Sequence, residues 1–363
     1  MGEHISSQGR RALLVLALVL GVAIVAVKPL TAAPSTSFGV TPLVSDQPGV
    51  APNTDPNLVN AWGLTSGPTT PWWVSDNGKD VSTLYRGSDG QPQPGPPQPH
   101  PLVVGVASAP TGTVFNPTSG FLLPGGSKAL FLFDTEDGGV LGWNQAQGTT
   151  AFLEKDFSSS GAVFKGLAIA DTANGPRLYA TDFHNAQVDV FDGSWNLVPN
   201  SGFSDPSIPH GYGPFGIQTI GTRVFVTYAK QDADQHDDVA GQGLGFVDVY
   251  DTSGNLLGRV AQHGQLNSPW GLALAPASFG RFAGDLLVGN FGDGQINAYA
   301  ELDNGHFEHR GELRDASGKS LSIDGLWALQ VGKGGNNGPA GTLFFTAGPD
   351  GESHGLFGQI KAN

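Results

Sequence analysis

A glycine-centred apolar patch recurs along the chain, and a β-rich run that usually ends in Asp or Asn follows each copy. The five clear copies are Asn60–Leu64 before Pro71–Gly78, Phe164–Ala168 before Leu178–Asn185, Pro214–Ile217 before Val224–Asp232, Pro269–Ala273 before Asp285–Asn290, and Asp324–Ala328 before Thr342–Ala347. A sixth, degenerate copy is assigned to Gly120–Leu123 before Ala129–Gly138. Repetition at roughly 50 residues is typical of stacked or radial folds, because no single unit can bury its own apolar face.

The repeats predict an all-β fold, a six-bladed β-propeller with four short antiparallel strands in each blade. The units begin near residues 58, 112, 162, 211, 266 and 322. Runs such as Val188–Asp192 and Gly245–Asp251 are the expected third strands, and Pro101–Gly105 is an expected fourth strand. The content of 54 Gly, 26 Pro and a single Met favours short strands and tight turns over helices. A β-sandwich or an open solenoid are the alternatives.

The chain is expected to have three parts. Residues 1–33 are predicted to be a signal peptide or an uncleaved N-terminal anchor, because Arg10 and Arg11 precede the apolar run 12–27 and small residues follow up to Ala33. The folded protein is therefore expected to be secreted or periplasmic, outside the cytoplasm. Residues 34–57 are a lead-in, and residues 58–363 are the propeller.

Two segments have a predicted role in the ring. The lead-in contains the strand-like piece Phe38–Ser45, and its part near Phe38–Val44 is expected to complete the last blade beside Gly355–Ile360, which leaves no sheet edge free. The Pro-rich stretch Gly90–Pro101 is expected to be a loop between the third and fourth strands of the first blade, because its prolines impose an extended, unpaired backbone.

Charge and cysteine content exclude several kinds of function. The net charge is −14 and the sequence has no basic stripe, which argues against nucleic acid as a partner. The same features argue against membrane binding by any segment other than an N-terminal anchor. The absence of cysteine excludes disulfides, thiolate metal sites and cysteine nucleophiles.

Polar residues are predicted to collect on one rim of the ring. In a meander the second strand returns toward the start of the inner strand, so its Asp or Asn end lies beside the residues that precede the inner-strand glycines. The residues proposed for ligand binding there are Trp62, Asp76, Asn77, Asp182, His184, Asn185, Lys230, Asn290, Asp324 and His354. Asp232, Asp293, Asp350, Lys165, Phe215 and Trp270 belong to the same rim. Capping of turns is the alternative role for the Asp and Asn residues.

The densest acidic segment, Lys230–Asp238, is a candidate metal site. Its proposed ligands are Asp232, Asp234, His236, Asp237 and Asp238. The oxygen ligands suit Ca²⁺ or Mg²⁺, and the imidazole would admit Zn²⁺ or Mn²⁺. The spacing is not that of an EF-hand. An exposed acidic loop with mobile counterions, or neutralisation by Lys230, are the alternatives.

Motifs of nucleophilic catalysis are missing. The sequence has neither a Gly-x-Ser-x-Gly elbow nor a His-Glu-x-x-His helix. His184 near Asp182 and His354 near Glu352 could act as general bases only where the fold brings a substrate to them.

Several long motifs resemble a family of exported bacterial proteins that is similar to NHL-type six-bladed propellers. The motifs are Asp55–Leu64, Ala180–Ala186, Tyr228–Gly241, Pro269–Pro276, Asp285–Gly294 and Glu352–Gly358. The resemblance covers about residue 40 to the end and implies a propeller without an established activity. The family often carries a C-terminal Pro-Glu-Pro sorting tail, which the final residues Lys361–Asn363 do not show.

Six-bladed lactonases of the gluconolactonase type offer a second comparison. They hold a divalent metal with acidic or amide groups, some of them just before the inner-strand glycines. The matching residues here are Trp62, Lys165, Phe215 and Trp270, and only Asp324 is suitable. The comparison therefore does not support the same metal site.

The sequence leaves three hypotheses of function. The first, which we favour, is a non-catalytic module that binds a small molecule, a glycan or a protein on its polar rim, with a possible Ca²⁺ or other divalent cation. The second is a metal-dependent hydrolase or lactonase with its site on the same rim. The third is a scaffold that acts through its acidic exterior alone.

Overall fold

The computed structural model describes Met1, residues 37–93 and residues 101–363. The predicted signal peptide, apart from Met1, and the middle of the Pro-rich insert lie outside the described residues. The chain divides into two units, Met1–Ala33 and Pro34–Asn363, and all strands of the described ranges belong to the second unit. No helix in the described ranges has the length and apolar character needed to cross a bilayer.

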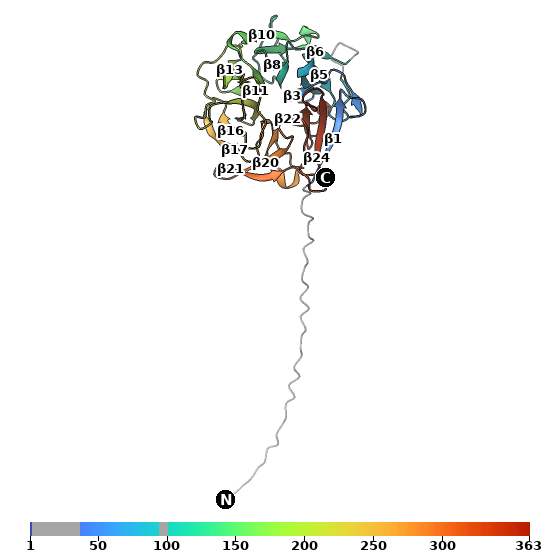
Figure 1. Cartoon of the computed structure of the whole chain (residues 1–363), viewed down its shortest axis with the longest axis vertical. Coiled ribbons are helices and arrows are strands. Elements are labelled where there is room, and N and C mark those ends of the chain that lie inside the picture. Colours follow the sequence, from blue (N-terminus) through green and yellow to red (C-terminus); the bar gives the residue numbers. More distant parts are fainter. Residues whose placement is uncertain (2–36, 94–100) are drawn as a thin grey trace. The chain divides into compact units, whose positions relative to one another are not determined.

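The described residues of the second unit form six sheets arranged around a common centre (Figure 1). The first sheet contains β3 (Ala61–Thr65), β4 (Trp72–Asp76), β5 (Val81–Tyr85) and β6 (Val103–Gly105). The second contains β7 (Pro110–Phe115), β8 (Phe131–Thr135), β9 (Gly139–Trp143) and β10 (Phe152–Asp156). The third contains β11 (Phe164–Thr172), β12 (Gly175–Asp182) and β13 (Gln187–Asp192).

The next two sheets complete most of the ring. They contain β14 (Tyr212–Ile220), β15 (Arg223–Lys230), β16 (Gly245–Asp251) and β17 (Leu256–Gln262); and β18 (Pro269–Leu274), β19 (Leu286–Asn290), β20 (Ile296–Glu301) and β21 (Phe307–Glu312). The protein is therefore an all-β, six-bladed β-propeller, as the repeats predict. Blade three departs from four full strands, because only a single bridge, Phe191 to Leu197, follows β13.

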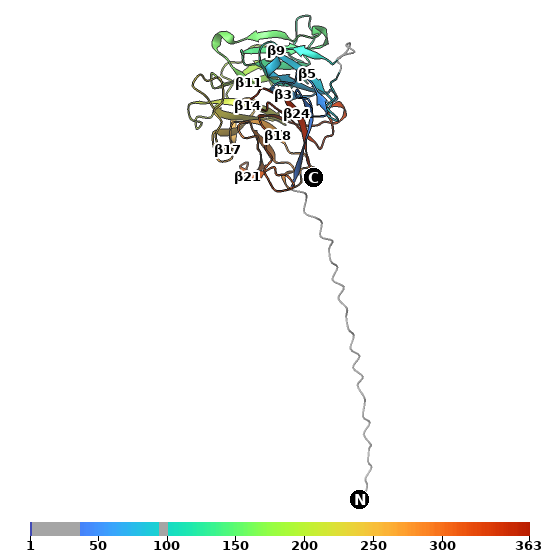
Figure 2. The same cartoon turned by 45° about the vertical axis from the view of Figure 1, so that its right-hand side comes forward.

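The sixth blade closes the ring with strands from both ends of this unit. It contains β22 (Leu326–Val331), β23 (Leu343–Ala347) and β24 (Leu356–Ala362), followed by β1 (Phe38–Ser45) and β2 (Asn53–Thr54). β1 pairs antiparallel with β24, from Phe38 opposite Ala362 to Ser45 opposite Leu356. Figure 2 shows β24 in this part of the ring, below β3. The predicted closing strand is thus confirmed.

The assignment of the second inner strand to Gly120–Leu123 is wrong. That strand is β7, and Gly120–Leu123 belongs to the connection between β7 and β8. The overlooked signal is the run Ala109-Pro-Thr-Gly112, which matches Gly213-Pro-Phe-Gly216 and Ser268-Pro-Trp-Gly271. Phe121 is buried within the core and not on an inner strand, so its apolar character misled the alignment.

A left-handed residue precedes most inner strands. Asn60, Ala109 and Ser268 have φ of 47°, 48° and 46°, and Gly325 holds the same place before β22. This conformation costs a non-glycine residue about 1 kcal/mol or more. The left-handed residue lies where the chain passes from the rim of one blade into the inner strand of the next, and the strain is confined to that turn.

The inner-strand glycines lie against the backbone of the next blade. A Cβ on Gly63 would lie 2.4 Å from the Thr111 carbonyl oxygen, and one on Gly271 would lie 2.5 Å from that of Trp327. Gly112, Gly166 and Gly216 contact the following blade in the same way, whereas Ala328 holds the sixth position. Glycine recurs here because inner strands converge near the axis and leave no room for a side chain.

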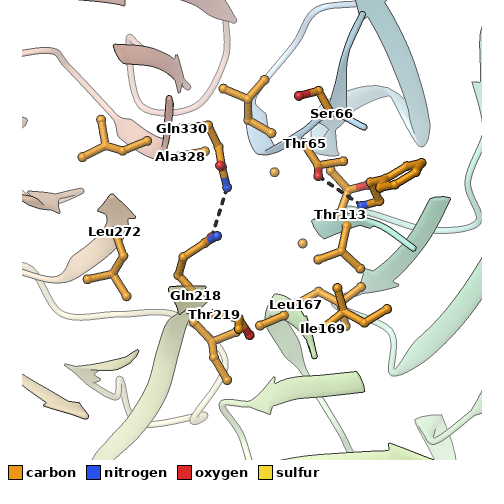
Figure 3. A pocket seen from close by; sticks show the side chains of 18 of the residues that line it. Thr65, Ser66, Thr113, Leu167, Ile169, Gln218, Thr219, Leu272, Ala328 and Gln330 are labelled. Carbon is orange, nitrogen blue, oxygen red and sulfur yellow. Dashed lines mark hydrogen bonds between the residues drawn. The ribbon is translucent and has the colours of Figure 1, made fainter. Parts of the chain in front are cut away.

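Apolar side chains fill the spaces between blades and one end of the central channel. Between the first two blades, for example, Trp73 stacks on Phe131 with ring centroids 4.0 Å apart. At the other end of the channel, where the inner strands finish, a cavity of about 360 Å³ remains (Figure 3). The polar rim and this cavity are therefore separate regions at opposite ends of the inner strands.

Candidate functional site

In each blade, the pairing between the inner strand and the second strand contains a register shift. The shift falls at the residue before the inner-strand glycine, or before Ala328 in the sixth blade. The six residues at these positions are Trp62, Thr111, Lys165, Phe215, Trp270 and Trp327. In the sixth blade the position is held by Trp327, so its assignment to Asp324 in the lactonase comparison is wrong. Gly325 is the left-handed residue before the strand and not the glycine inside it, so Asp324 does not lie at the matching position. No carboxylate therefore occupies any of the six positions.

Four of these side chains fill the channel as an aromatic plug. Trp62 stacks on Trp327 with centroids 3.5 Å apart, and Trp327 stacks on Phe291 at 4.0 Å. Phe215 and Trp270 pack edge-on against the Trp62 ring. All except Phe291 are buried, so these rings pack against one another and do not form an open wall for a ligand.

Lys165 is the charged member of the six, and it organises the polar rim above the plug. Its side chain is 2 % exposed, and its Nζ donates to Glu136 Oε1 and, at 3.3 Å, to Asp237 Oδ1. The ammonium also lies 5.3 Å from the centroid of the Trp62 ring, where the π face favours a cation. A buried ammonium without such partners would be very costly, so this pairing fixes Glu136 in place.

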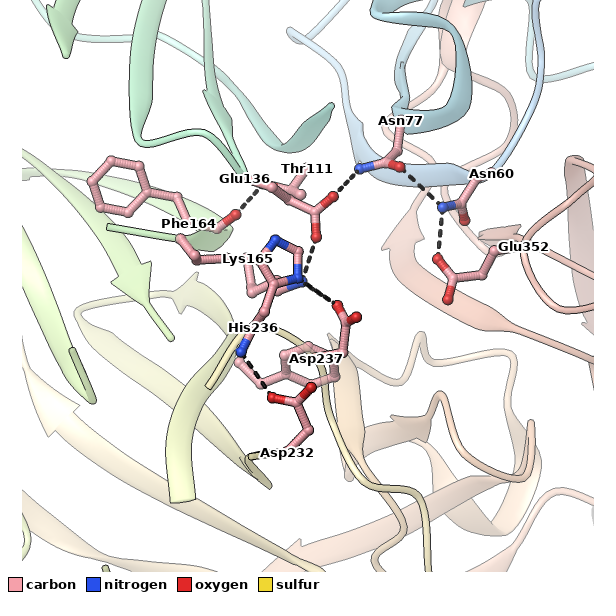
Figure 4. A network of polar contacts seen from close by, with 12 residues as sticks. Asn60, Asn77, Thr111, Glu136, Phe164, Lys165, Asp232, His236, Asp237 and Glu352 are labelled. Atoms are coloured by element: carbon pink, nitrogen blue, oxygen red, sulfur yellow. Dashed lines mark hydrogen bonds and ion pairs between the residues drawn. The ribbon is translucent and has the colours of Figure 1, made fainter. Parts of the chain in front are cut away.

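An amide relay extends this cluster to the sixth blade (Figure 4). Asn77 Nδ2 donates to Glu136 Oε2 at 2.9 Å, and Asn60 Nδ2 donates to Asn77 Oδ1 and to Glu352 Oε2 at 3.1 and 2.7 Å. Trp327 Nε1 donates to Asn60 Oδ1. Burial, with repulsion from Glu136, raises the pKa of Glu352, although the Asn60 bond opposes the shift. Blades one, two, three, four and six therefore share one network.

The acidic loop after β15 is shaped by its own hydrogen bonds. Asp232 Oδ1 accepts from the His236 backbone N–H at 2.9 Å, and His236 Nδ1 lies 2.9 Å from Asp237 Oδ1. Burial opposes ionisation of Asp237, yet Lys165 and His236 hold its pKa below the ordinary value. Asp238 is turned inward, where burial raises its pKa. Asp234 is exposed.

The described residues form one cluster with the geometry for a metal ion. It consists of Glu136, His236 and Asp237, whose ligand atoms lie within 4.8 Å of one another. Of the five loop residues predicted as ligands, only His236 and Asp237 join it, and Glu136 comes from another blade. Lys165 already donates to both carboxylates, so a metal would compete with an ammonium in place. Neutralisation by a lysine is thus observed, but the residue is Lys165. Lys230 instead lies over the Tyr212 ring.

The other predicted rim residues lie apart from the Lys165 cluster. Asp76 is buried and accepts from Thr83, Asp182 accepts from the backbone N–H and Nδ2 of Asn185, and Asp324 accepts from the Asp350 backbone N–H. Asn290 donates to the Gln265 carbonyl and to Asp293, and His354 Nδ1 lies 2.7 Å from Asp46 of the lead-in. His184 lies beside Gly161 in the neighbouring turn. Only the Asp182–Asn185 and Asn290–Asp293 contacts have the short spacing of a turn cap, and the other hydrogen bonds join separate segments.

Burial shifts two of these carboxyls toward the protonated form. It raises the pKa of Asp76 well above its ordinary value despite the Thr83 bond, and it raises that of Asp182 despite the Asn185 bonds. Burial thus disfavours the charge with which these two carboxyls would hold a cation.

A cavity of about 440 Å³ opens on the rim beside the Lys165 cluster. Three carboxyl-bearing residues, Glu136, Asp137 and Asp156, line it together with His236, and no Lys or Arg of the described ranges belongs to its lining. The main residues that the sequence reasoning missed are Glu136 and Asn60, and Glu352, expected beside His354, contacts Asn60 instead. Glu136 follows the Asp134-Thr135 end of β8 as Asn77 follows β4, so correct alignment of blade two would have found it.

Comparison with solved structures shows low similarity at high coverage. A virginiamycin B lyase from Staphylococcus aureus aligns with 90% of this chain and 99% of its own, at 13% identity and a TM-score of 0.48. A calcium-binding protein, regucalcin, from Agrobacterium tumefaciens aligns with 91% of this chain and 97% of its own, at 12% identity and a TM-score of 0.47. No family model matches the chain.

Sequence relatives are found in Acanthamoeba polyphaga mimivirus. "Uncharacterized protein R648" is 33% identical over 337 residues, which span 90% of this chain and 80% of that protein. "Uncharacterized protein L690" is 30% identical over 350 residues, which span 89% and 86%. These relatives are viral, and the resemblance to exported bacterial proteins stays a prediction. The chain belongs to the same protein family as these two mimivirus proteins, and its fold is a six-bladed β-propeller.

Proposed function

We propose that the protein is a binding module that takes a small cationic or hydroxyl-rich ligand, such as a polyamine or a sugar, in the rim cavity beside Lys165. One observation carries the proposal: the cavity is lined by Glu136, Asp137 and Asp156 and by no Lys or Arg from the part of the chain that the structure describes. Carboxylates around a cavity of this volume attract positive charge and accept hydrogen bonds from hydroxyl or amine groups.

The Lys165 cluster supports a prepared site rather than a merely acidic surface. Lys165 and Asn77 hold the two oxygens of Glu136, so this carboxylate keeps its position without a ligand. His236 uses Nδ1 toward Asp237, and its side chain is 47% exposed, which leaves Nε2 for a ligand group. A site with fixed acceptors loses less conformational entropy when it binds.

Calorimetric titration of the purified protein with spermidine, glucosamine and cellobiose tests the proposal. These probes are a polyamine, a cationic sugar and a neutral sugar. We expect saturable binding of at least one probe, weakened tenfold or more in Glu136→Gln. The control Asp303→Asn removes one charge from the exposed β20–β21 turn and should leave the affinity unchanged. Equal weakening in both variants would show a general charge effect, and no binding of any probe would reject the site.

A metal-dependent hydrolase or lactonase is the second candidate, and the cluster Glu136, His236 and Asp237 favours it. One imidazole and two carboxylates could hold Zn²⁺, Mn²⁺ or Ca²⁺, and a bound Zn²⁺ can activate water for attack on an ester or lactone. Lys165 is ion-paired with both carboxylates, so these residues do not by themselves form a site that activates water for hydrolysis.

Elemental analysis with thermal unfolding, with and without EDTA, separates the two functions. A stoichiometric metal that is lost in His236→Ala, together with lactone or ester hydrolysis, would support the hydrolase. Lys165→Met should then bind the metal more tightly, because the competing ammonium is gone. Absence of metal at equilibrium with added Zn²⁺, Mn²⁺ or Ca²⁺ would eliminate the hydrolase and leave the binding module.

A further inference from the structure

The cavity at the opposite end of the channel differs from the rim cavity in both shape and charge. Its walls are mainly apolar, with Leu64, Val114, Leu167, Ile217 and Leu272 among them, and the plug residue Trp270 also borders it. Its volume of about 360 Å³ lies within the range of small-molecule sites, about 300–1,000 Å³. The cavity is thus large enough for a small apolar molecule, and the aromatic plug separates it from the rim.

The side chains of Gln218 and Gln330 bring amide groups to this cavity. Gln330 Nε2 donates to Gln218 Oε1 at 3.1 Å, and this bond joins blades four and six (Figure 3). The second N–H of Gln330 and the amide nitrogen of Gln218 have no other side-chain or backbone partner among the described residues. Two amide donors can therefore turn toward a bound acceptor.

Among the described residues, Lys333 is the one ionisable residue that lines the cavity. Its Nζ donates to the Ser66 carbonyl oxygen at 2.5 Å, and among the described residues it makes no ion pair. Desolvation lowers the pKa of this ammonium. An ammonium with one neutral partner next to apolar walls lacks a counter-charge, which a bound anion would supply.

A groove of about 600 Å³ adjoins the cavity and shares Gln218, Leu272, Gln330 and Lys333 with it. The groove continues along Leu274, which is 49% exposed, and Pro276. No carboxylate of the described residues belongs to its lining. Lys333 and the two glutamines thus stand where two apolar spaces meet, and this arrangement suits a polar head with an elongated apolar body.

We propose that this central cavity is a second binding site, which takes a small amphipathic monoanion such as a carboxylate with an apolar chain. The carboxylate pairs with Lys333 and accepts from the amides of Gln218 and Gln330. The apolar chain lies against the leucine and isoleucine walls. This site is independent of the rim, where carboxylates dominate and an anion would be repelled.

Three probes with the same apolar chain and different heads test this site: octanoate, octanol and octylamine. We expect the purified protein to bind octanoate at one molecule per chain, with octanol weaker and octylamine weakest. Lys333→Met should weaken octanoate at least tenfold while octanol changes less than threefold. Lys333→Arg keeps the charge and should keep most of the octanoate affinity.

Two further variants control for folding and for charge elsewhere. Lys79→Met removes a positive charge from an exposed lysine at the other rim and should bind octanoate as the wild type does. Ile169→Trp places a larger side chain on the cavity wall and should weaken both octanoate and octanol. Unchanged thermal midpoints would show that the variants are folded.

Three results would overturn the proposal: no binding of octanoate, equal octanoate affinity in Lys333→Met and wild type, or unchanged binding in Ile169→Trp. Glu136→Gln should leave octanoate binding unchanged, because that residue lies at the other rim. Failure of the rim site would therefore not affect this test.

Discussion

Gly216 lies so close to Trp270 of the next blade that a Cβ on the glycine would be 2.1 Å from the Trp270 carbonyl oxygen. The same close approach recurs around the ring, from Gly63 to Gly271, and it explains why the sequence repeats a glycine rather than a particular aromatic residue. The contact involves backbone on one side, so neither partner can move away without shifting an inner strand.

Gly216→Ala is expected to destabilise the protein by at least about 2 kcal/mol, because the added methyl group overlaps backbone. Gly258→Ala is the matched control, since Gly258 lies in β17 and a Cβ there would have nothing within 4 Å. Its expected effect is neutral or a gain of up to about 1 kcal/mol. Urea unfolding of both variants measures the difference, and similar stabilities would contradict the close-contact argument.

Lys165→Met is expected to cost about 3 kcal/mol or more of the free energy of unfolding, because Glu136 and Asp237 lose their cation. The double variant Lys165→Met, Glu136→Gln should lose less than the single variant, since it removes a carboxylate left unpaired. Denaturant unfolding is the measurement, with Lys79→Met as control. A double variant no more stable than the single one would show that the loss comes from packing instead.

Val44→Asp is expected to reduce stability by more than about 3 kcal/mol, because it places a charge at a fully buried position of the closing strand. Thr41→Asp is made on the same strand at an exposed residue and should change stability by less than about 0.5 kcal/mol. Thermal unfolding compares the two. Equal midpoints would mean that β1 contributes little to ring closure.

Asp134 predicts a pH dependence of stability. Burial raises its pKa to about 7 from 3.8, although hydrogen bonds from Thr111 and Gly112 oppose the shift. The folded protein therefore holds this proton more tightly than the unfolded chain, so this group makes stability fall as pH rises from about 4 to 7, with little change above. The effect is at most about 1.4 kcal/mol per pH unit.

Asp134→Asn has no such titration, so its stability relative to wild type should improve between pH 4.5 and about 7 and level off by pH 7.5. Urea unfolding at four pH values in this window measures the difference. Asp189 and Asp248, whose pKa values burial raises to about 6, titrate in both proteins and cancel in the comparison. Parallel stability curves for the two proteins would contradict a buried, protonated Asp134.

The fold could be predicted from sequence because its determinants are local and repeated. Each Gly-centred inner strand, its turn and its second strand lie within a few tens of residues, so spacing alone predicts six blades. The closing strand followed from the need to cover the edge of the last blade, and β1 beside β24 confirms it. Blade two was misaligned because Thr111 and Thr113 flank its inner-strand glycine, whereas the apolar run Gly120–Leu123 lies a few residues later.

The candidate site could be predicted only in part. A meander places the ends of second strands on one rim, so Asn77, His236 and Asp237 were assigned to the right region from local order. Which side chains meet there depends on contacts across the ring, such as Lys165 with Asp237, 72 residues apart, and Asn60 with Glu352, 292 residues apart. No local pattern encodes such pairs.

The sequence by itself determined the repeat, the number of blades, the closing strand and the acidic character of the chain. The tertiary structure alone decided that Lys165 rather than Lys230 neutralises the acidic loop, and that aromatic rings fill the channel. It also decided that carboxylates face one end of the channel and a lone ammonium, Lys333, the other. The physical reason is that strand formation depends on neighbouring residues, whereas a site depends on which side chains six converging blades bring within a few ångströms.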